Sequence, residues 1–89
     1  MQRTKIIATE VAMPTTAGAA SSISEATCVR LFNGSGATAT VSISTAVGAA
    51  TTNTFTMATG GVEFLQKAST DVIFASSASV RAAKVGLTN

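Results

Sequence analysis

Few residues in this chain could carry out chemistry, and their types restrict what that chemistry could be. The sequence contains no histidine, which excludes Ser-His-Asp and Cys-His catalysis and the usual proton shuttle at neutral pH. The one cysteine, Cys28, therefore lacks its common activator, and we interpret it as a small hydrophobic residue buried in a strand. A single cysteine also excludes a disulfide within the chain and supplies too few ligands for zinc.

Four carboxylates are present, at Glu10, Glu25, Glu63 and Asp71. A glycosidase needs two carboxyl groups about 5–10 Å apart across a cleft, and Glu63 and Asp71 could in principle approach each other. A chain of 89 residues has a thin core, however, that can hardly enclose a sugar-binding cleft. The four acids are also too dispersed for a calcium-binding loop. We therefore expect solvated charges here, and no enzyme activity, cofactor or metal site.

The surface composition is unusual for a free monomer. Only 11% of the residues are charged and the net charge is +2, whereas an ordinary soluble domain has about 25% charged residues. Such a surface, rich in alanine, serine and threonine, is common where neighbouring subunits cover it; a β domain with a threonine-rich solvent face is the alternative. The basic residues are too scattered for nucleic-acid binding. Neither a membrane span nor a secretory signal is predicted.

Apolar and polar residues alternate along most of the chain, which is typical of strands with one buried face. The pattern is clean over residues 37–44, and residues 27–32 form a second β-rich run. Asn33-Gly34 lies between the two runs. Because Asn-Gly favours the positive φ angles of a type I′ turn, it predicts a hairpin that joins them.

The second half of the chain repeats this organisation. Residues 54–57, 62–67, 71–75 and 80–87 are expected strands, and turn signals recur about every 8–12 residues. All four phenylalanines fall in patterns suited to a core. The predicted fold is all-β, a compact β-sandwich or flattened barrel of about six to eight short antiparallel strands.

The N-terminal part differs from the rest. Residues 4–11 could form a strand, but residues 12–24 contain little bulk and the only proline, Pro14, so they are interpreted as a flexible connection. Residues 1–25 are thus a predicted arm and connection, and residues 26–89 the sandwich body of a single domain. The arm could pair with its own sheet or add a strand to that of a neighbour.

Two parts of the chain supply candidates for contact with a partner protein. The arm carries basic and large apolar residues, whose charges could touch an acidic partner or lie in solvent. On the strand 27–32, Phe32 shares a face with Arg30, which makes it the best candidate for an exposed ring. The candidate interface residues are Arg3, Lys5, Ile6, Ile7, Arg30 and Phe32.

Several segments resemble small virion proteins of tailed bacteriophages, especially those of marine and cyanobacterial hosts. The shared patterns are a strand with VRLxN, a strand with GxVEFLxK, a TDxIxAS segment and a terminal AxKVG. The stretches of this sequence that carry the resemblance are residues 29–36, 55–57, 61–68, 70–75 and 83–89. The resemblance covers roughly residues 29–89, and the first 25 residues have no counterpart in it.

The resemblance implies a structural role without catalytic residues. The expected function is a capsid decoration or cement protein that binds the major capsid protein or other virion proteins and clamps capsid subunits. Such a protein would assemble into the virion in the bacterial cytoplasm, as a homo-oligomer such as a trimer, or bound to the lattice. The alternative is a minor neck, tail or tail-fibre component that binds host glycans, against which the absence of Trp and Tyr counts.

Overall fold

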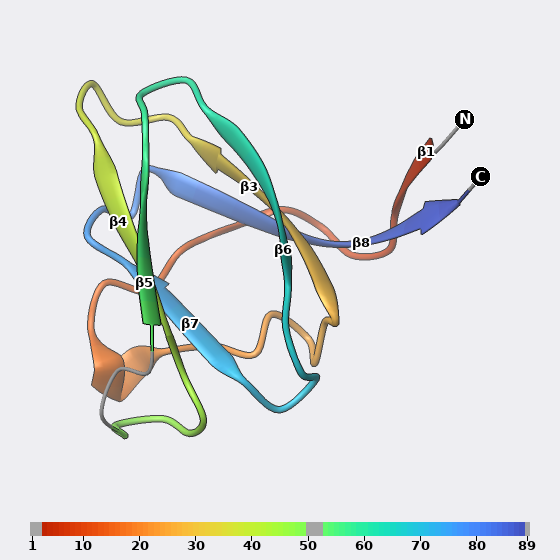
Figure 1. Ribbon diagram of the computed structural model, residues 1–89, viewed down its shortest axis with the longest axis horizontal. Coiled ribbons are helices and arrows are strands. Elements are labelled where there is room, and N and C mark those ends of the chain that lie inside the picture. Colours follow the sequence, from red (N-terminus) through yellow and green to blue (C-terminus); the bar gives the residue numbers. More distant parts are fainter. Residues whose placement is uncertain (1–2, 50–52, 89) are drawn as a thin grey trace.

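The structure is a computed structural model that describes residues 3–49 and 53–88. These residues form eight strands and one short 3-10 helix (Figure 1). Along the chain they are β1 (Arg3–Ile6), β2 (Val11–Ala12), η1 (Ala17–Ala19), β3 (Cys28–Asn33), β4 (Ala39–Ser44), β5 (Asn53–Met57), β6 (Val62–Gln66), β7 (Val72–Ala75) and β8 (Val80–Thr88). The prediction of an all-β fold with six to eight short strands is confirmed.

The strands form two antiparallel sheets that pack as a sandwich. The larger sheet has the order β1-β8-β3-β6, and the two-residue β2 pairs with β8 as its fifth strand. The smaller sheet has the order β5-β4-β7. Because β6 and β1 end the larger sheet and β5 ends the smaller one, each of these strands has a backbone edge that no other strand among residues 3–49 and 53–88 pairs with.

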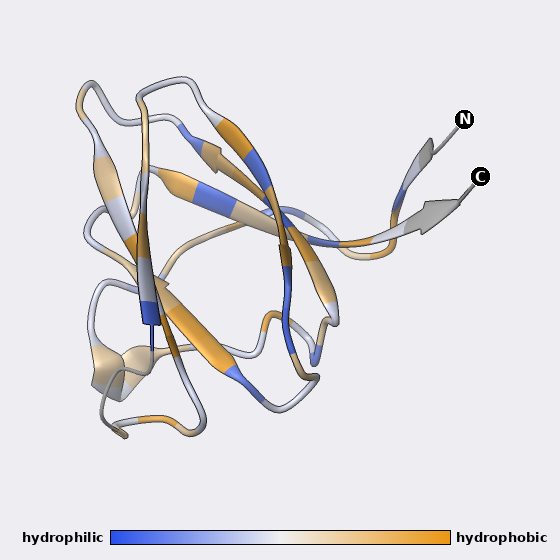
Figure 2. Ribbon diagram, viewed as in Figure 1, coloured by the Kyte–Doolittle hydropathy of each residue, from blue (hydrophilic) through white to orange (hydrophobic). Residues whose placement is uncertain are grey.

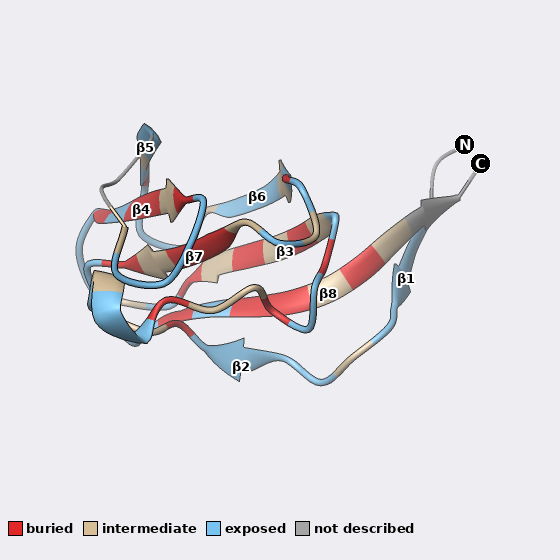
Figure 3. Ribbon diagram, turned by 90° about the horizontal axis from the view of Figure 1, so that it is seen from below, coloured by how far each residue is buried: buried red, intermediate tan, exposed pale blue. Residues whose placement is uncertain are grey.

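The core lies between the two sheets and takes alternate side chains from β3, β4, β5, β7 and β8. Val29 and Leu31 of β3 are fully buried in one cluster with Val41 of β4 and Ile73 of β7. Figure 2 shows the concentration of hydrophobic residues on β7, and Figure 3 shows the buried residues gathered on β3, β4, β7 and β8. Each such side chain contributes about 1.5–3 kcal/mol on burial, so the alternating pattern in the sequence is the main source of stability.

The predicted hairpin across Asn33-Gly34 is wrong. Strand β3 pairs with β6 and β8, whereas β4 pairs with β5 and β7, so the two runs belong to different sheets. A type I′ turn needs positive φ at both central residues, and neither Asn33 nor Gly34 has it. Gly34 is instead needed for a close approach, because a Cβ atom there would lie 3.0 Å from the backbone oxygen of Ser79. The segment therefore crosses between the sheets.

The side chain of Asn33 holds this crossing in place. It is fully buried, and its Nδ2 lies 3.0 Å from the carbonyl oxygen of Ala37, 3.1 Å from that of Met57 and 3.2 Å from that of Ala58. Its Oδ1 accepts the backbone N–H of Ser35 at 3.0 Å. A residue of one sheet thus satisfies backbone groups at the end of the other sheet, which is why the Asn-Gly pair does not form a hairpin turn.

The segment predicted as a flexible connection packs along the sandwich. Met13 and Ile23 from this segment are buried and belong to the core cluster. The backbones of Ser21 and Ile73 exchange two hydrogen bonds, of 3.0 and 2.8 Å, beside β7. The segment therefore supplies part of the core and pairs with the outer edge of the smaller sheet.

Strand β1 pairs with the last residues of β8, and the two strands project from the body as a ribbon (Figures 1 and 3). The register runs from Arg3 opposite Thr88 to Ile6 opposite Val85. The arm is thus paired with the sheet of its own chain, which is one of the two expected arrangements. Because Ile6 is 73% exposed and Ile7 52% exposed, the ribbon presents large apolar side chains to the surroundings.

We predict that Asn33→Ala lowers the free energy of unfolding by about 2–3 kcal/mol, since it removes the side-chain donor from the buried Met57 carbonyl group and from those of Ala37 and Ala58. Urea unfolding followed by circular dichroism measures this difference. Asn53→Ala, at an exposed position of β5, is the control and should change stability by less than about 0.5 kcal/mol. Equal effects of the two substitutions would contradict the role of Asn33 as the link between the sheets.

Candidate interaction surface

The side of the larger sheet that points away from the core brings together residues from β1, β3, β6 and β8. Directly paired residues of neighbouring strands project to the same side of a sheet. Ile6 is paired with Val85, Arg30 with both Ala83 and Phe64, and Phe32 with Val62. We call this side, formed chiefly by Ile6, Arg30, Phe32, Val62, Phe64 and Val85, the outer face. It includes three of the six predicted interface residues.

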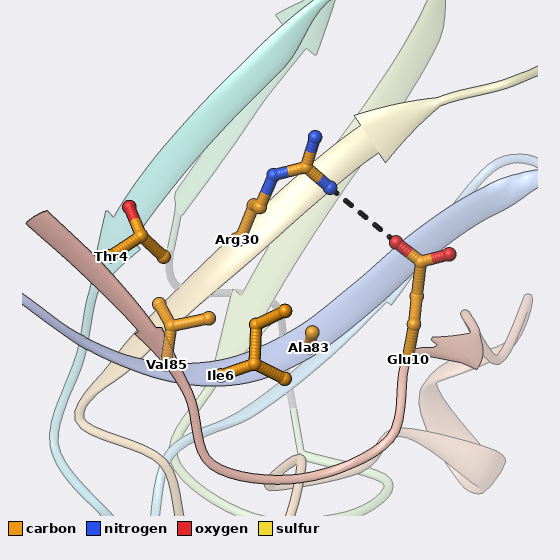
Figure 4. Close-up of a pocket in the computed structure, with 6 residues that line it drawn as sticks. All are labelled: Thr4, Ile6, Glu10, Arg30, Ala83 and Val85. Atoms are coloured by element: carbon orange, nitrogen blue, oxygen red, sulfur yellow. Dashed lines mark hydrogen bonds and ion pairs between the residues drawn. The ribbon is translucent and has the colours of Figure 1, made fainter.

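A cavity of about 330 Å³ lies on the outer face beside the ribbon. Figure 4 shows its lining: apolar side chains of β1 and β8 form the floor, and two charged side chains meet above one end. The lining residues are Thr4, Ile6, Glu10, Arg30, Ala83 and Val85. The structure thus places Ile6 and Arg30, which are 24 positions apart in the sequence, in one site.

The two charged residues of this cavity form an ion pair. Arg30 Nη1 lies 3.5 Å from Glu10 Oε2, and the two side chains are 36% and 42% exposed. A long, solvated pair of this kind contributes at most about 1 kcal/mol to stability. Its structural effect is to connect the segment before β2 with β3, while the remaining hydrogen-bonding groups of both side chains stay accessible to a partner.

A second hollow of about 410 Å³ adjoins the first on the outer face and shares Val85 with it. It is lined by Thr27, Cys28, Phe64, Gln66, Val85 and Gly86. Phe64 is 47% exposed and Val62 is 42% exposed, so the assignment of all four phenylalanines to the core is corrected at Phe64 and also at Phe32, which is half-buried on the outer face. The reason is that Phe64 pairs with Arg30, whose strand turns its buried face, Val29 and Leu31, to the other side.

The predicted interface residues that do not line the first cavity are spread over the ribbon and the outer face. Lys5 and Ile7 are exposed on the ribbon, on the opposite side of β1 from Ile6. Arg3 is paired with Thr88 through its strand, and its side chain lies outside the described part of the structure. Phe32 is half-buried on the outer face, on the same side of β3 as Arg30. Cys28 is a free cysteine on this face and is also half-buried.

Lys67 is a buried charged residue that the sequence pattern did not distinguish from the other scattered basic residues. It is 6% exposed, and its Nζ donates hydrogen bonds to the carbonyl oxygens of Asp71 at 2.8 Å and Ala68 at 3.2 Å. Desolvation by burial lowers the pKa of Lys67 below 10.5, the Asp71 carboxylate opposes this shift, and Lys84 adds to it. Its fixed backbone partners indicate a role in closing the turn between β6 and β7.

Groups of three or more His, Cys, Asp or Glu side chains that could hold a metal ion do not occur in the parts of the chain that the structure describes. Over the same residues, no helix has the length and apolar character needed to cross a bilayer. Comparisons of the chain with known protein families, with curated proteins and with solved structures found no match.

We predict that the wild-type protein gains stability relative to Lys67→Met as the pH rises towards 10.5. Because the pKa of Lys67 is lower in the folded state, the unfolded chain holds the proton more tightly, and the cost of burying the charge disappears as the folded protein loses that proton. Urea unfolding of both proteins at several pH values measures the difference. A difference that is constant or falls with rising pH would contradict the buried state of Lys67.

Proposed function

We propose that the protein is a non-enzymatic structural component of a bacteriophage virion, a capsid decoration or cement protein that binds capsid subunits through its outer face. Its mechanism is the burial of apolar and small polar surface against another protein, without chemical transformation of a ligand. The resemblance of residues 29–89 to small phage virion proteins supports this class of partner, and the exposed apolar side chains of the outer face support its use as the binding surface.

The observation that carries this proposal is the combination of exposed large apolar side chains with a very low charge density. Ile6, Val62 and Phe64 are each more than 40% exposed and lie on one side of one sheet. Only 11% of the chain is charged, so few charges surround these side chains to keep them in water. Exposed aromatic and aliphatic side chains around an arginine are typical of a surface that another protein covers.

Purified virions of the phage that encodes this chain provide the first test. Quantitative mass spectrometry should find on the order of hundreds of copies in each particle, because a symmetric shell repeats the same contact on every equivalent subunit. A copy number of about a dozen or fewer would place the protein in the neck, tail or fibre, where symmetry provides fewer sites. Absence from virions would overturn the structural role.

A substitution on the outer face tests which surface is used. We expect Phe64→Asp to reduce co-sedimentation of the purified protein with capsids at least about tenfold, since a charge then has to be buried at the centre of the contact. The matched control is Thr54→Asp, at an exposed position of the smaller sheet, which should bind as the wild type does. Equal binding of all three proteins would exclude the outer face as the binding surface.

One observation favours the alternative of a glycan-binding tail component. The ring of Phe64 is about half exposed and lines a hollow together with Thr27 and Gln66, and an aromatic ring beside polar side chains is a common platform for a sugar. Specific binding on a glycan array, lost in the Phe64→Asp variant and combined with a low copy number, would replace the capsid role by host recognition.

A further inference from the structure

We propose that copies of this chain join head to tail, by pairing the free edge of β1 in one copy with the free edge of β6 in the next. This inference deepens the proposed function, since it names how neighbouring copies would connect, but it depends only on the two edges. The partner is a second copy of this chain, because the two edges match in hydrogen-bonding groups, apolar side chains and charge.

The hydrogen bonds of β6 show which of its backbone groups are free. Asn33 N–H donates to the carbonyl oxygen of Gly61 at 3.0 Å, and Lys67 N–H donates to that of Thr27 at 3.1 Å. Because the direction of these groups alternates along an antiparallel strand, Glu63 and Leu65 direct their N–H and C=O groups towards β3. Val62 and Phe64 therefore direct theirs to the free edge.

The same reasoning applies to β1. Ile7 N–H donates to the carbonyl oxygen of Lys84 at 2.9 Å, next to the pair formed by Ile6 and Val85. Lys5 therefore directs its backbone groups towards β8, and Thr4 and Ile6 direct theirs away from it. Both edges thus offer two residues with free donors and acceptors, spaced two positions apart.

One antiparallel register satisfies all of these groups and also matches the side chains. With Thr4 opposite Phe64 and Ile6 opposite Val62, the free N–H and C=O groups of these residues bond to one another. Lys5 then lies directly opposite Glu63, and both are exposed in the isolated chain. Shifting the register by two residues keeps the backbone bonds possible but places Lys5 opposite Leu65 or Gly61. Charge complementarity therefore selects the first register.

Pairing in this register continues the sheet from one copy to the next. Ile6 and Val62, both on the outer face and both more than 40% exposed, become cross-strand neighbours and cover each other. The contact is heterologous, because β1 and β6 are different surfaces, so repeated association closes into a ring or extends as a filament. The number of copies depends on the rotation between neighbours.

Sedimentation equilibrium of the purified full-length chain, from about 10 μM to 1 mM, tests the inference over the range in which a small interface dissociates. We expect concentration-dependent association that Lys5→Glu and Glu63→Lys each weaken about tenfold, and that the double variant restores to within about threefold. The controls are Arg81→Glu and Glu25→Lys, which reverse charges at exposed positions away from both edges. A monomer throughout this range, or association unaffected by Lys5→Glu and Glu63→Lys, would overturn the proposal.

A backbone variant tests the hydrogen bonds separately from the charges. Val62→Pro removes an N–H that points to the free edge and leaves the bonds between β6 and β3 in place, so it should abolish association while circular dichroism stays unchanged. Val62→Thr keeps the N–H and should associate as the wild type does. Equal association of the two variants would also overturn the edge pairing.

These measurements use the chain alone, so they are independent of binding to virions. Association of the chain without capsid binding would reject only the proposed function. Capsid binding by a monomeric chain would reject only the edge pairing.

Discussion

The buried amide of Asn33 is the interaction on which the arrangement of the two sheets depends. Its backbone belongs to β3, and its side chain donates to the carbonyl groups of Ala37, which precedes β4, and of Met57, the last residue of β5. A small domain buries little apolar surface, so a polar contact that fixes where the chain passes between the sheets has a large effect on which fold is reached. An apolar residue of similar size would remove the side-chain donor from the buried Met57 carbonyl group, whereas the Ala37 carbonyl would keep the Ser35 hydroxyl as a donor.

The crossings between the sheets also determine which strands lie at the edges. The chain passes from β3 to β4 and from β5 to β6 near Asn33, where Gly60 N–H donates to the Asn33 carbonyl oxygen at 2.8 Å. Strand β6 therefore joins the larger sheet beside β3 and not beside β5. This position turns Val62 and Phe64 to the outer face and leaves the other edge of β6 free. The surface that we propose for partners is thus a consequence of the crossing.

The fold class could be predicted from the sequence because strand periodicity depends on neighbouring residues alone. The alternation over residues 37–44 reappears as buried Ala39 and Val41 in β4, and the expected number of strands is observed. The hairpin could not be judged in this way. The Asn-Gly signal is local, whereas the conformation of this segment depends on the distant carbonyl groups of Met57 and Ala58, to which the buried Asn33 side chain donates. The same limit explains Lys67, whose burial depends on the turn between β6 and β7.

The candidate site was only partly accessible from the sequence for a related reason. Ile6 and Arg30 could be proposed from their residue types, but their meeting in one cavity depends on the pairing of both β1 and β3 with β8. Phe64 was assigned to the core because a single strand pattern shows two faces without showing which one is covered. In a two-layer sandwich every strand of the larger sheet has one face without a second layer, and a low overall charge leaves that face apolar. If neighbouring copies continue this sheet, their outer faces form one surface. The contact between copies uses the backbone edges with Lys5 and Glu63, and it places Ile6 and Val62 of the outer face beside each other at the seam. Phe64, Arg30 and the second hollow remain on the same side of the continued sheet and are the groups left for a capsid. The two contacts can therefore form at the same time, as a shell component that joins its neighbours requires.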